Sequence, residues 1–210
     1  MINVDKNTFL DINLKAINKN YKIIKQIVGR KCIIAATVKA NAYGLGADQV
    51  VNSLIKKGCK YFFVATTNEA IYLRKLDKRI FIFILNGLVT KELKNIRKFN
   101  LIPVINNLAQ LKKIENYQKE NNCFLNIAIH FDTGMSRLGL DQNETENLIK
   151  QKASLIKKSQ VQLIMSHLSC ADDKKSKLNK IQLNKFNLIK LNLFNCILFN
   201  FDFLSSAQDR

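Results

Sequence analysis

Lys39 stands between an apolar run and a glycine-containing segment, in the stretch Ile33–Gly46, IIAATVKANAYGLG. A run this rich in Ile and Val predicts a strand buried on both faces. Burying an ammonium group is costly, so the pKa of a lysine at the end of such a strand is expected to fall, and its neutral amine could then form a Schiff base with a carbonyl. Tyr43 and the two glycines could offer a hydroxyl and backbone N–H groups to a phosphate. A lysine beside a phosphate cradle suggests pyridoxal phosphate, whereas the alternative is a lysine that only reaches solvent beside an ordinary turn.

Other side chains that could take part in a site stand, like Lys39, at or just after the carboxyl end of a later apolar run. Leu85 closes one run, the segment from His130 to Arg137 follows another, and His167 and Ser206 follow two more. Parallel strands present their carboxyl ends at one edge of a sheet, so these groups are expected to share a rim. Each has an ordinary alternative: His167 as an interior histidine, Arg137 in an ion pair within its loop, Ser206 as a helix N-cap. Together they predict a site with an arginine suited to a carboxylate and hydroxyls suited to a phosphate.

Strands and helices that would position these groups alternate along the whole chain. Apolar runs predict seven strands, at residues 33–38, 61–65, 80–85, 101–105, 124–131, 161–165 and 196–203, with helical periodicity between them. A short extra strand is expected over residues 9–14 and a helix over residues 17–28. This alternation predicts parallel strands with right-handed crossovers. A (β/α)8 barrel needs eight strands, so periodicity alone leaves that barrel and a doubly wound open sheet both possible.

Composition narrows the class of protein. The chain has 210 residues, 47% of them hydrophobic, and no stretch near the roughly 20 apolar residues of a membrane span. Its amino terminus has no apolar signal region, and its five cysteines form no C-x-x-C pair, so neither a metal site nor a disulfide scaffold is expected and the predicted location is cytoplasmic. The net charge of +18 suggests nucleic-acid binding as a hypothesis. The lysines are, however, spread over every helical segment and do not form one stripe, so no nucleic-acid partner is expected.

Three segments resemble bacterial alanine racemases: VKANAYGLG at Val38–Gly46, FDTGMSRLG at Phe131–Gly139 and MSHLSCAD at Met165–Asp172. They occur in the family's order and at similar spacing. The resemblance implies that residues 1–210 are the family's amino-terminal (β/α)8 barrel domain, with residues 1–14 as a leading strand segment and the eighth strand missing. It implies pyridoxal 5′-phosphate as cofactor and interconversion of L- and D-alanine, which supplies D-alanine for peptidoglycan.

The resemblance also implies a role for each matching residue. Lys39 would hold the cofactor and act as the acid or base on one face of the substrate Cα. Tyr43 and Ser206 would bind the phosphate, and Arg137 would lie near the cofactor's phenolic oxygen and the substrate carboxylate. The cofactor-binding set implied in this way is Lys39, Tyr43, Leu85, Arg137, His167 and Ser206.

The chain departs from the family pattern at three places. Leu45 replaces a histidine, and His130 stands where many members have a carbamylated lysine that holds the arginine. His130 either braces Arg137 directly or leaves it without a brace. Full-length members continue with an eighth strand and a β domain, which carries the opposite-face tyrosine across a homodimer interface. The sequence is therefore expected to be a truncated racemase, inactive or weakly active by itself.

The sequence is also compatible with other functions. One alternative is a single-domain pyridoxal-phosphate-binding protein of the cofactor-homeostasis type, without racemase activity. A decarboxylase with the same barrel fits the segment Phe131–Gly139 less well. Alanine as substrate follows from the resemblance alone, and serine or another small amino acid would also be compatible.

Overall fold

The computed structural model describes residues 10–150 and 160–194. Its contacts divide the chain into two units, Met1–Ile82 and Phe83–Arg210. Within the described residues, no helix has both the length and the apolar character needed to cross a membrane.

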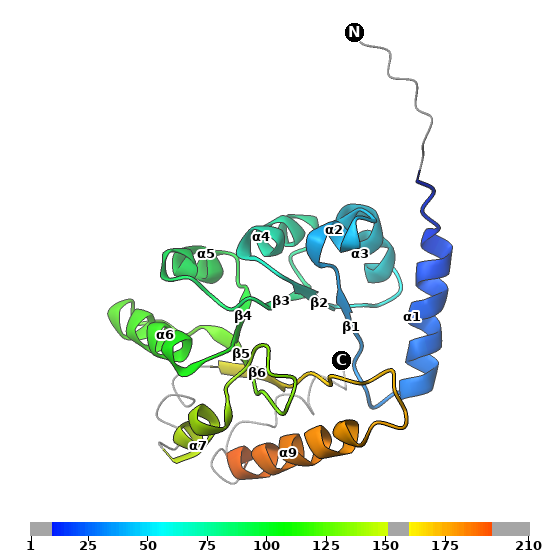
Figure 1. Ribbon diagram of the computed structural model, residues 1–210. Coiled ribbons are helices and arrows are strands. Elements are labelled where there is room, and N and C mark those ends of the chain that lie inside the picture. The colour runs from blue at the N-terminus through cyan, green and yellow to red at the C-terminus, as the bar shows by residue number, and fades with distance from the viewer. Residues whose placement is uncertain (1–9, 151–159, 195–210) are drawn as a thin grey trace, which may run out of the picture. The chain divides into compact units, whose positions relative to one another are not determined.

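The first unit contains two parallel strands and the helices that follow them (Figure 1). Its elements are α1 (Leu14–Val28), β1 (Ala35–Thr37), α2 (Lys39–Tyr43), α3 (Ala47–Ile55), β2 (Tyr61–Val64) and α4 (Thr67–Leu76). β1 and β2 pair with Ala36 opposite Phe62. Helix α3 buries Ala47, Val50, Val51 and Leu54, which recur at the i, i+3, i+4, i+7 spacing of one helix face. This apolar face and the buried side chains of β2 and α4 form the core of the unit.

The second unit continues the alternation of strand and helix (Figure 1). Its elements are β3 (Phe81–Ile84), which begins in the first unit, η1 (Thr90–Glu92), α5 (Leu93–Lys98), β4 (Ile102–Ile105), α6 (Leu108–Glu120), β5 (Asn126–His130), α7 (Gln142–Lys150), β6 (Gln160–Met165) and α9 (Lys177–Phe194). β3 pairs with β4, β4 with β5 and β5 with β6, all in parallel. Every residue of β4 is buried, as expected for a parallel strand covered on both faces.

The strand order decides the fold class. The strands are arranged in chain order from β1 to β6, with each joined to the next through a helix. A doubly wound sheet reverses its strand order at a switch point, whereas a (β/α)8 barrel keeps chain order throughout. The fold is therefore that of an incomplete (β/α)8 barrel, as the family resemblance implied, and the doubly wound alternative is wrong. The seventh predicted strand, residues 196–203, lies outside the described residues.

The prediction of a strand over residues 9–14 is wrong where the structure describes it. Leu10 to Asn13 form no strand, and Leu14 already begins α1. The side chain of Asn13 accepts a hydrogen bond from the Ala16 N–H and so caps that helix. The alternation of Leu10, Ile12 and Leu14 misled the prediction, because an alternating segment becomes a strand only when a partner strand is present.

One turn of the first unit has an unusual backbone. Ala40, Asn41, Ala42 and Tyr43 all have φ between 51° and 56°, so α2 is a left-handed turn formed by four residues other than glycine. Left-handed helical geometry costs an L-residue about 1–2 kcal/mol. Hydrogen bonds oppose that cost: the Ala42 N–H donates to Val38 O at 2.9 Å, and the Asn41 side chain accepts from the Ala47 N–H at 2.8 Å. The turn fixes the chain just after β1.

Candidate functional site

Lys39 and Tyr43 lie close together at the carboxyl end of β1. Lys39 is partly exposed, and its Nζ lies 5.9 Å from the centroid of the Tyr43 ring. Tyr43 is 63% exposed, and its hydroxyl has no hydrogen-bond partner within the described part of the chain. The first unit therefore presents an amine beside a tyrosine ring, both accessible to a small molecule.

Glu69 holds the backbone beside Lys39 in place. Its carboxylate accepts hydrogen bonds from the N–H groups of Ala40 at 2.7 Å, Ala65 at 2.7 Å and Thr66 at 3.2 Å. Glu69 thereby joins the residue after Lys39 to the end of β2 and to the start of α4. The motif Thr66-x-x-Glu69 is a capping box, and both of its hydrogen bonds are present. The sequence interpretation overlooked Glu69, although a T-x-x-E motif directly after a predicted strand was available as a signal.

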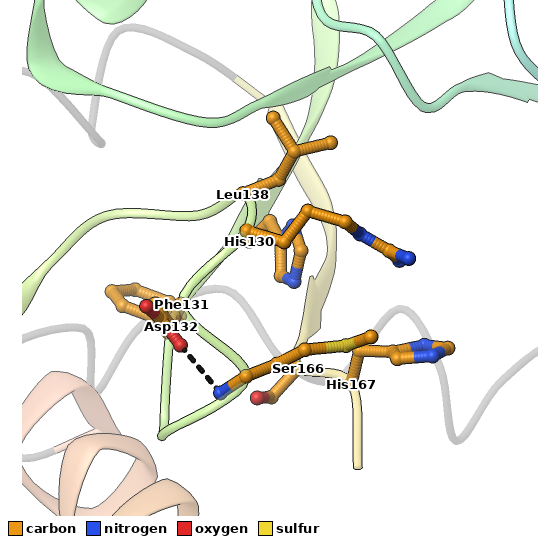
Figure 2. Close-up of a pocket in the computed structure, with 8 residues that line it drawn as sticks. His130, Phe131, Asp132, Leu138, Ser166 and His167 are labelled. Atoms are coloured by element: carbon orange, nitrogen blue, oxygen red, sulfur yellow. Dashed lines mark hydrogen bonds between the residues drawn. The ribbon is translucent and has the colours of Figure 1, made fainter. Parts of the chain in front are cut away.

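The second unit has a shallow pocket at the carboxyl ends of β5 and β6 (Figure 2). Its lining comes from His130 and the loop that follows it, together with Ser166 and His167. The residues around it are His130, Phe131, Asp132, Met135, Arg137, Leu138, Ser166 and His167. Arg137 and His167 are both exposed, so the alternative of an interior histidine is wrong for His167. The structure thus brings two of the predicted site residues to one pocket.

Hydrogen bonds close the base of the loop that carries Arg137, and others order its interior. Leu140 donates its N–H to His130 O at 2.8 Å, and the Asp132 N–H donates to Leu140 O at 2.9 Å. This closure needs Gly139, because a Cβ there would stand 2.7 Å from the Asp132 nitrogen and φ is +109°. The loop therefore presents Arg137 at a fixed place on the rim.

Asp132 orders the inner part of that loop. Its Oδ1 accepts hydrogen bonds from the N–H groups of Gly134, Met135 and Ser136, at 2.9–3.0 Å. Figure 2 shows one of these as a dashed line. Partial burial acts to raise the pKa of Asp132, but these three donors outweigh it and hold the pKa below its usual value. Asp132 is thus a carboxylate engaged with the backbone, and Arg137 forms no ion pair with it or with any other described residue.

Leu85 connects to the pocket through its backbone. The side-chain Nδ2 of Asn106 donates to Leu85 O at 2.9 Å, and the Oδ1 of Asn106 lies 2.9 Å from the Nδ1 of His130. The ends of β3, β4 and β5 are joined by this chain of hydrogen bonds. Asn106 was not predicted as a site residue, although it follows the fourth predicted strand directly and lies on the same rim.

Gln182 of α9 ties His167 to the loop above β5. Only 1% of Gln182 is exposed, and its Nε2 donates to His167 O at 3.0 Å and to Thr133 Oγ1 at 3.4 Å. Its Oε1 accepts from the N–H of Ser169 at 3.0 Å and from its hydroxyl at 2.9 Å. A single buried side chain therefore satisfies several polar groups beside His167.

Replacing Gln182 with alanine should destabilise the protein by about 1–3 kcal/mol, because the part-buried hydrogen bonds to the Ser169 N–H and the His167 C=O are lost. Urea unfolding followed by circular dichroism measures the change. Gln142→Ala is the control, since Gln142 is an exposed glutamine on α7 that bonds only Glu146. That control should change the free energy of unfolding by less than about 0.5 kcal/mol. Equal effects of the two substitutions would contradict the role of Gln182.

The predicted site residues therefore fall into two groups. Lys39 and Tyr43 belong to the first unit, and Leu85, Arg137 and His167 belong to the second. Ser206 lies outside the described residues. Within residues 10–150 and 160–194 no cluster of His, Cys, Asp and Glu could hold a metal ion.

Comparison with known proteins gives a consistent result. The family described as "Alanine racemase, N-terminal domain" matches residues 12–207. The alanine racemase of Rickettsia prowazekii (strain Madrid E) is 42% identical over 175 residues, which are 83% of this chain and 43% of the relative. The crystal structure of alanine racemase from Bartonella henselae, described with covalently bound pyridoxal phosphate, has a TM-score of 0.83 and 34% identity, and the match covers 87% of this chain and 53% of that one.

A further solved structure, the biosynthetic alanine racemase from Pseudomonas aeruginosa, matches with a TM-score of 0.72 and 31% identity over 82% of this chain and 47% of that chain. The chain spans about half the length of the relatives that it matches.

Proposed function

This chain belongs to the alanine racemase family, and from that premise we propose that it binds pyridoxal 5′-phosphate through Lys39 and takes part in the interconversion of L-alanine and D-alanine. The D-alanine would serve the synthesis of peptidoglycan. The observation that carries the proposal is the position of Lys39. Its amine follows a parallel β-strand, lies beside the Tyr43 ring, and is held there by a left-handed turn.

The residues present fit this cofactor. An accessible primary amine can bond covalently to an aldehyde carbon, and the adjacent Tyr43 hydroxyl can donate to a phosphate oxygen. When bound, pyridoxal phosphate supplies an electron sink that acidifies the Cα–H of an amino acid. Ser206 is proposed as a second phosphate ligand, and Leu85 and His167 as residues that contact the ring.

Arg137 and Lys39 are proposed for the substrate. The guanidinium of Arg137 is exposed at a pocket and makes no hydrogen bond to a described residue, so it can bind a carboxylate with two parallel hydrogen bonds. Lys39 would remove or return the Cα proton on one face. Inversion needs a second acid–base group on the opposite face, and we propose that a partner subunit supplies it in a homodimer, as the family resemblance implies.

The cofactor-homeostasis alternative is less favoured, because the relatives reported above are named alanine racemases. We also place the protein in the cytoplasm. The four described cysteines are free thiols, in keeping with a reducing compartment.

Peptide mapping tests the proposal directly. The protein is incubated with pyridoxal phosphate, reduced with borohydride, digested and examined by mass spectrometry. The expected result is one phosphopyridoxyl group per chain, on the peptide that contains Lys39. Chiral chromatography of alanine incubated with the protein measures racemisation in parallel. Modification of another lysine, or a scattered pattern, would contradict the assignment of Lys39.

A further inference from the structure

Three loops of the first unit lie at the edge where its strands begin. They lead into β1, β2 and β3 and comprise residues 29–34, 56–60 and 77–80. β1 and β2 pair in parallel with Ala35 opposite Tyr61, and the Phe81 N–H donates to Lys60 O at 2.8 Å. The three strands therefore start side by side, and the loops before them share one edge, at the opposite end of the strands from Lys39.

These loops are strongly basic. Together they contain seven lysines and arginines and one acid, Asp77. Asp77 forms an ion pair with Arg79 at 2.9 Å. The other six basic side chains are exposed and make no ion pair or hydrogen bond with a described residue. These six residues are called the basic edge below: Arg30, Lys31, Lys56, Lys57, Lys60 and Lys78.

The stability of the helices does not account for the basic edge. A helix dipole favours bases near the C-terminus, but the effect falls off within the last turn, and Lys60 and Lys78 lie beyond the ends of α3 and α4. The remaining acids among residues 10–82 are Asp11, Asp48 and Glu69, and none belongs to these loops. Positive charge is therefore left uncompensated at this edge.

An aromatic pair lies between two of the loops. The rings of Tyr61 and Phe81 are stacked, with their centroids 4.9 Å apart and an interplanar angle of 10°. Tyr61 directly follows Lys60, and Phe81 is 40% exposed. Proteins that bind single-stranded nucleic acid combine basic side chains, which follow the phosphates, with aromatic rings on which bases stack. The basic edge and Phe81 together have this composition.

The same loops fit a lipid surface poorly. A protein segment that lies in a membrane interface buries large apolar side chains between its basic ones. In the three loops, all of whose residues the structure describes, Ile33 is the one large apolar side chain that is exposed. Residues 56–60 and 77–80 expose charged side chains instead.

We propose that the basic edge binds single-stranded nucleic acid, with its six bases on the phosphates and Phe81 stacked on an unpaired base. Phosphates are common to every sequence, so the binding does not depend on base sequence. The even spread of lysines along the chain argued against this partner, but the fold gathers the ends of successive helices at one edge. Because Lys39 lies at the other end of the strands, the proposal does not rest on the proposed function.

Fluorescence anisotropy of a labelled oligothymidylate of about 20 nucleotides tests the proposal with the unmodified chain. Each phosphate contact to a single strand contributes about −0.7 to the slope of log K against log salt concentration. Six contacts should therefore give a slope of about −4. Absence of binding at low salt, or a slope near zero, would overturn the proposal.

Removal of three charges locates the binding surface. The combined variant Lys56→Gln, Lys57→Gln, Lys60→Gln should bind about 10–100-fold more weakly near 0.1 M salt, and its slope should be smaller in magnitude by about 2. All three side chains are exposed, so the fold should be retained, and circular dichroism verifies this. Unchanged affinity would overturn the assignment to this edge.

A matched variant removes the same charge elsewhere. Lys174→Gln, Lys175→Gln, Lys177→Gln replaces three exposed lysines of the second unit. Its dissociation constant should stay within about twofold of that of the unmodified protein. Equal losses in the two triple variants would show that binding follows net charge alone, and would overturn the proposal.

Two further measurements test the kind of partner. Phe81→Leu keeps an apolar side chain but removes the ring, so it should weaken binding about fivefold or more with the salt slope unchanged. Sedimentation with vesicles of phosphatidylglycerol and phosphatidylcholine provides the lipid surface, and at the same salt concentration the protein should stay in the supernatant. Full affinity of Phe81→Leu would overturn the stacking. Sedimentation that disappears in the Lys56, Lys57, Lys60 variant would overturn the choice of nucleic acid in favour of a membrane.

Discussion

Replacing Lys39 with alanine should abolish the covalent attachment of pyridoxal phosphate, and any alanine racemisation that the unmodified protein shows should fall by about 10³-fold or more. Lys39 is expected to provide both the amine that bonds the cofactor and the group that moves the proton on one face of the substrate. The Nζ of Lys39 lies 5.9 Å from the centroid of the Tyr43 ring. Mass spectrometry after borohydride reduction measures the attachment, and chiral chromatography measures the rate.

Two further lysine substitutions make this result specific. Lys39→Arg keeps the positive charge but removes the nucleophile, so it should be as deficient as the alanine variant. Lys56→Ala, at the end of α3, removes a lysine away from the turn and should leave attachment unchanged. If Lys39→Ala still carried one cofactor per chain after reduction, the assignment of the site to the end of β1 would have to be abandoned.

Replacing Glu69 with glutamine should lower both the stability of the protein and the rate of cofactor attachment. The carboxylate accepts three backbone N–H groups, and an amide offers one oxygen in place of two and turns its own N–H₂ toward one of those donors. We expect the free energy of unfolding to fall by about 2 kcal/mol, a moderate value because Glu69 is partly exposed to solvent. Release of the Ala40 N–H should also loosen the backbone next to Lys39, so cofactor attachment should slow. Urea unfolding and a time course of attachment measure the two effects.

Glu92→Gln is the matched control for Glu69. Glu92 also accepts a backbone N–H at the start of a helical segment, from Val89 at 3.3 Å, but it makes only that one bond at the surface. It should cost less than about 0.5 kcal/mol and leave the attachment rate unchanged. Equal losses of stability from the two substitutions would show that Glu69 acts only as a helix cap and does not support Lys39.

The periodicity of the sequence predicted most of the elements that the structure describes. Five of the six described strands lie within a predicted apolar run, for example β4 at Ile102–Ile105 within 101–105, and β6 (Gln160–Met165) begins one residue before its run. The fold itself needed more, because strand and helix alternate alike in a barrel and in a doubly wound sheet. Only the pairing of each strand with the next in chain order separates the two. At Leu10 to Asn13 the sequence prediction was wrong, because local alternation predicted a strand where the structure has none.

The sequence predicted the residues of the candidate site that carry reactive groups. It did not predict the residues that hold those groups in position. Lys39, Arg137 and His167 were found because a charged or titratable side chain after an apolar run is unusual. Asn106 and Gln182 act through buried hydrogen bonds to groups distant in sequence, such as the bond from Gln182 to His167 O fifteen residues away. Short polar residues of this kind are common after strands and within helices, so type and spacing alone do not distinguish them.

The left-handed turn after β1 also limits which mutations the gene can tolerate. Ala40 is exposed and Ala42 is buried, yet both have φ above 50°. A branched Cβ is poorly tolerated in that backbone conformation whether or not water surrounds it. One base change converts any alanine codon into a valine codon. Ala40 should therefore be as intolerant of that change as a core residue, and a survey of random variants should find valine depleted at both positions while glycine is retained.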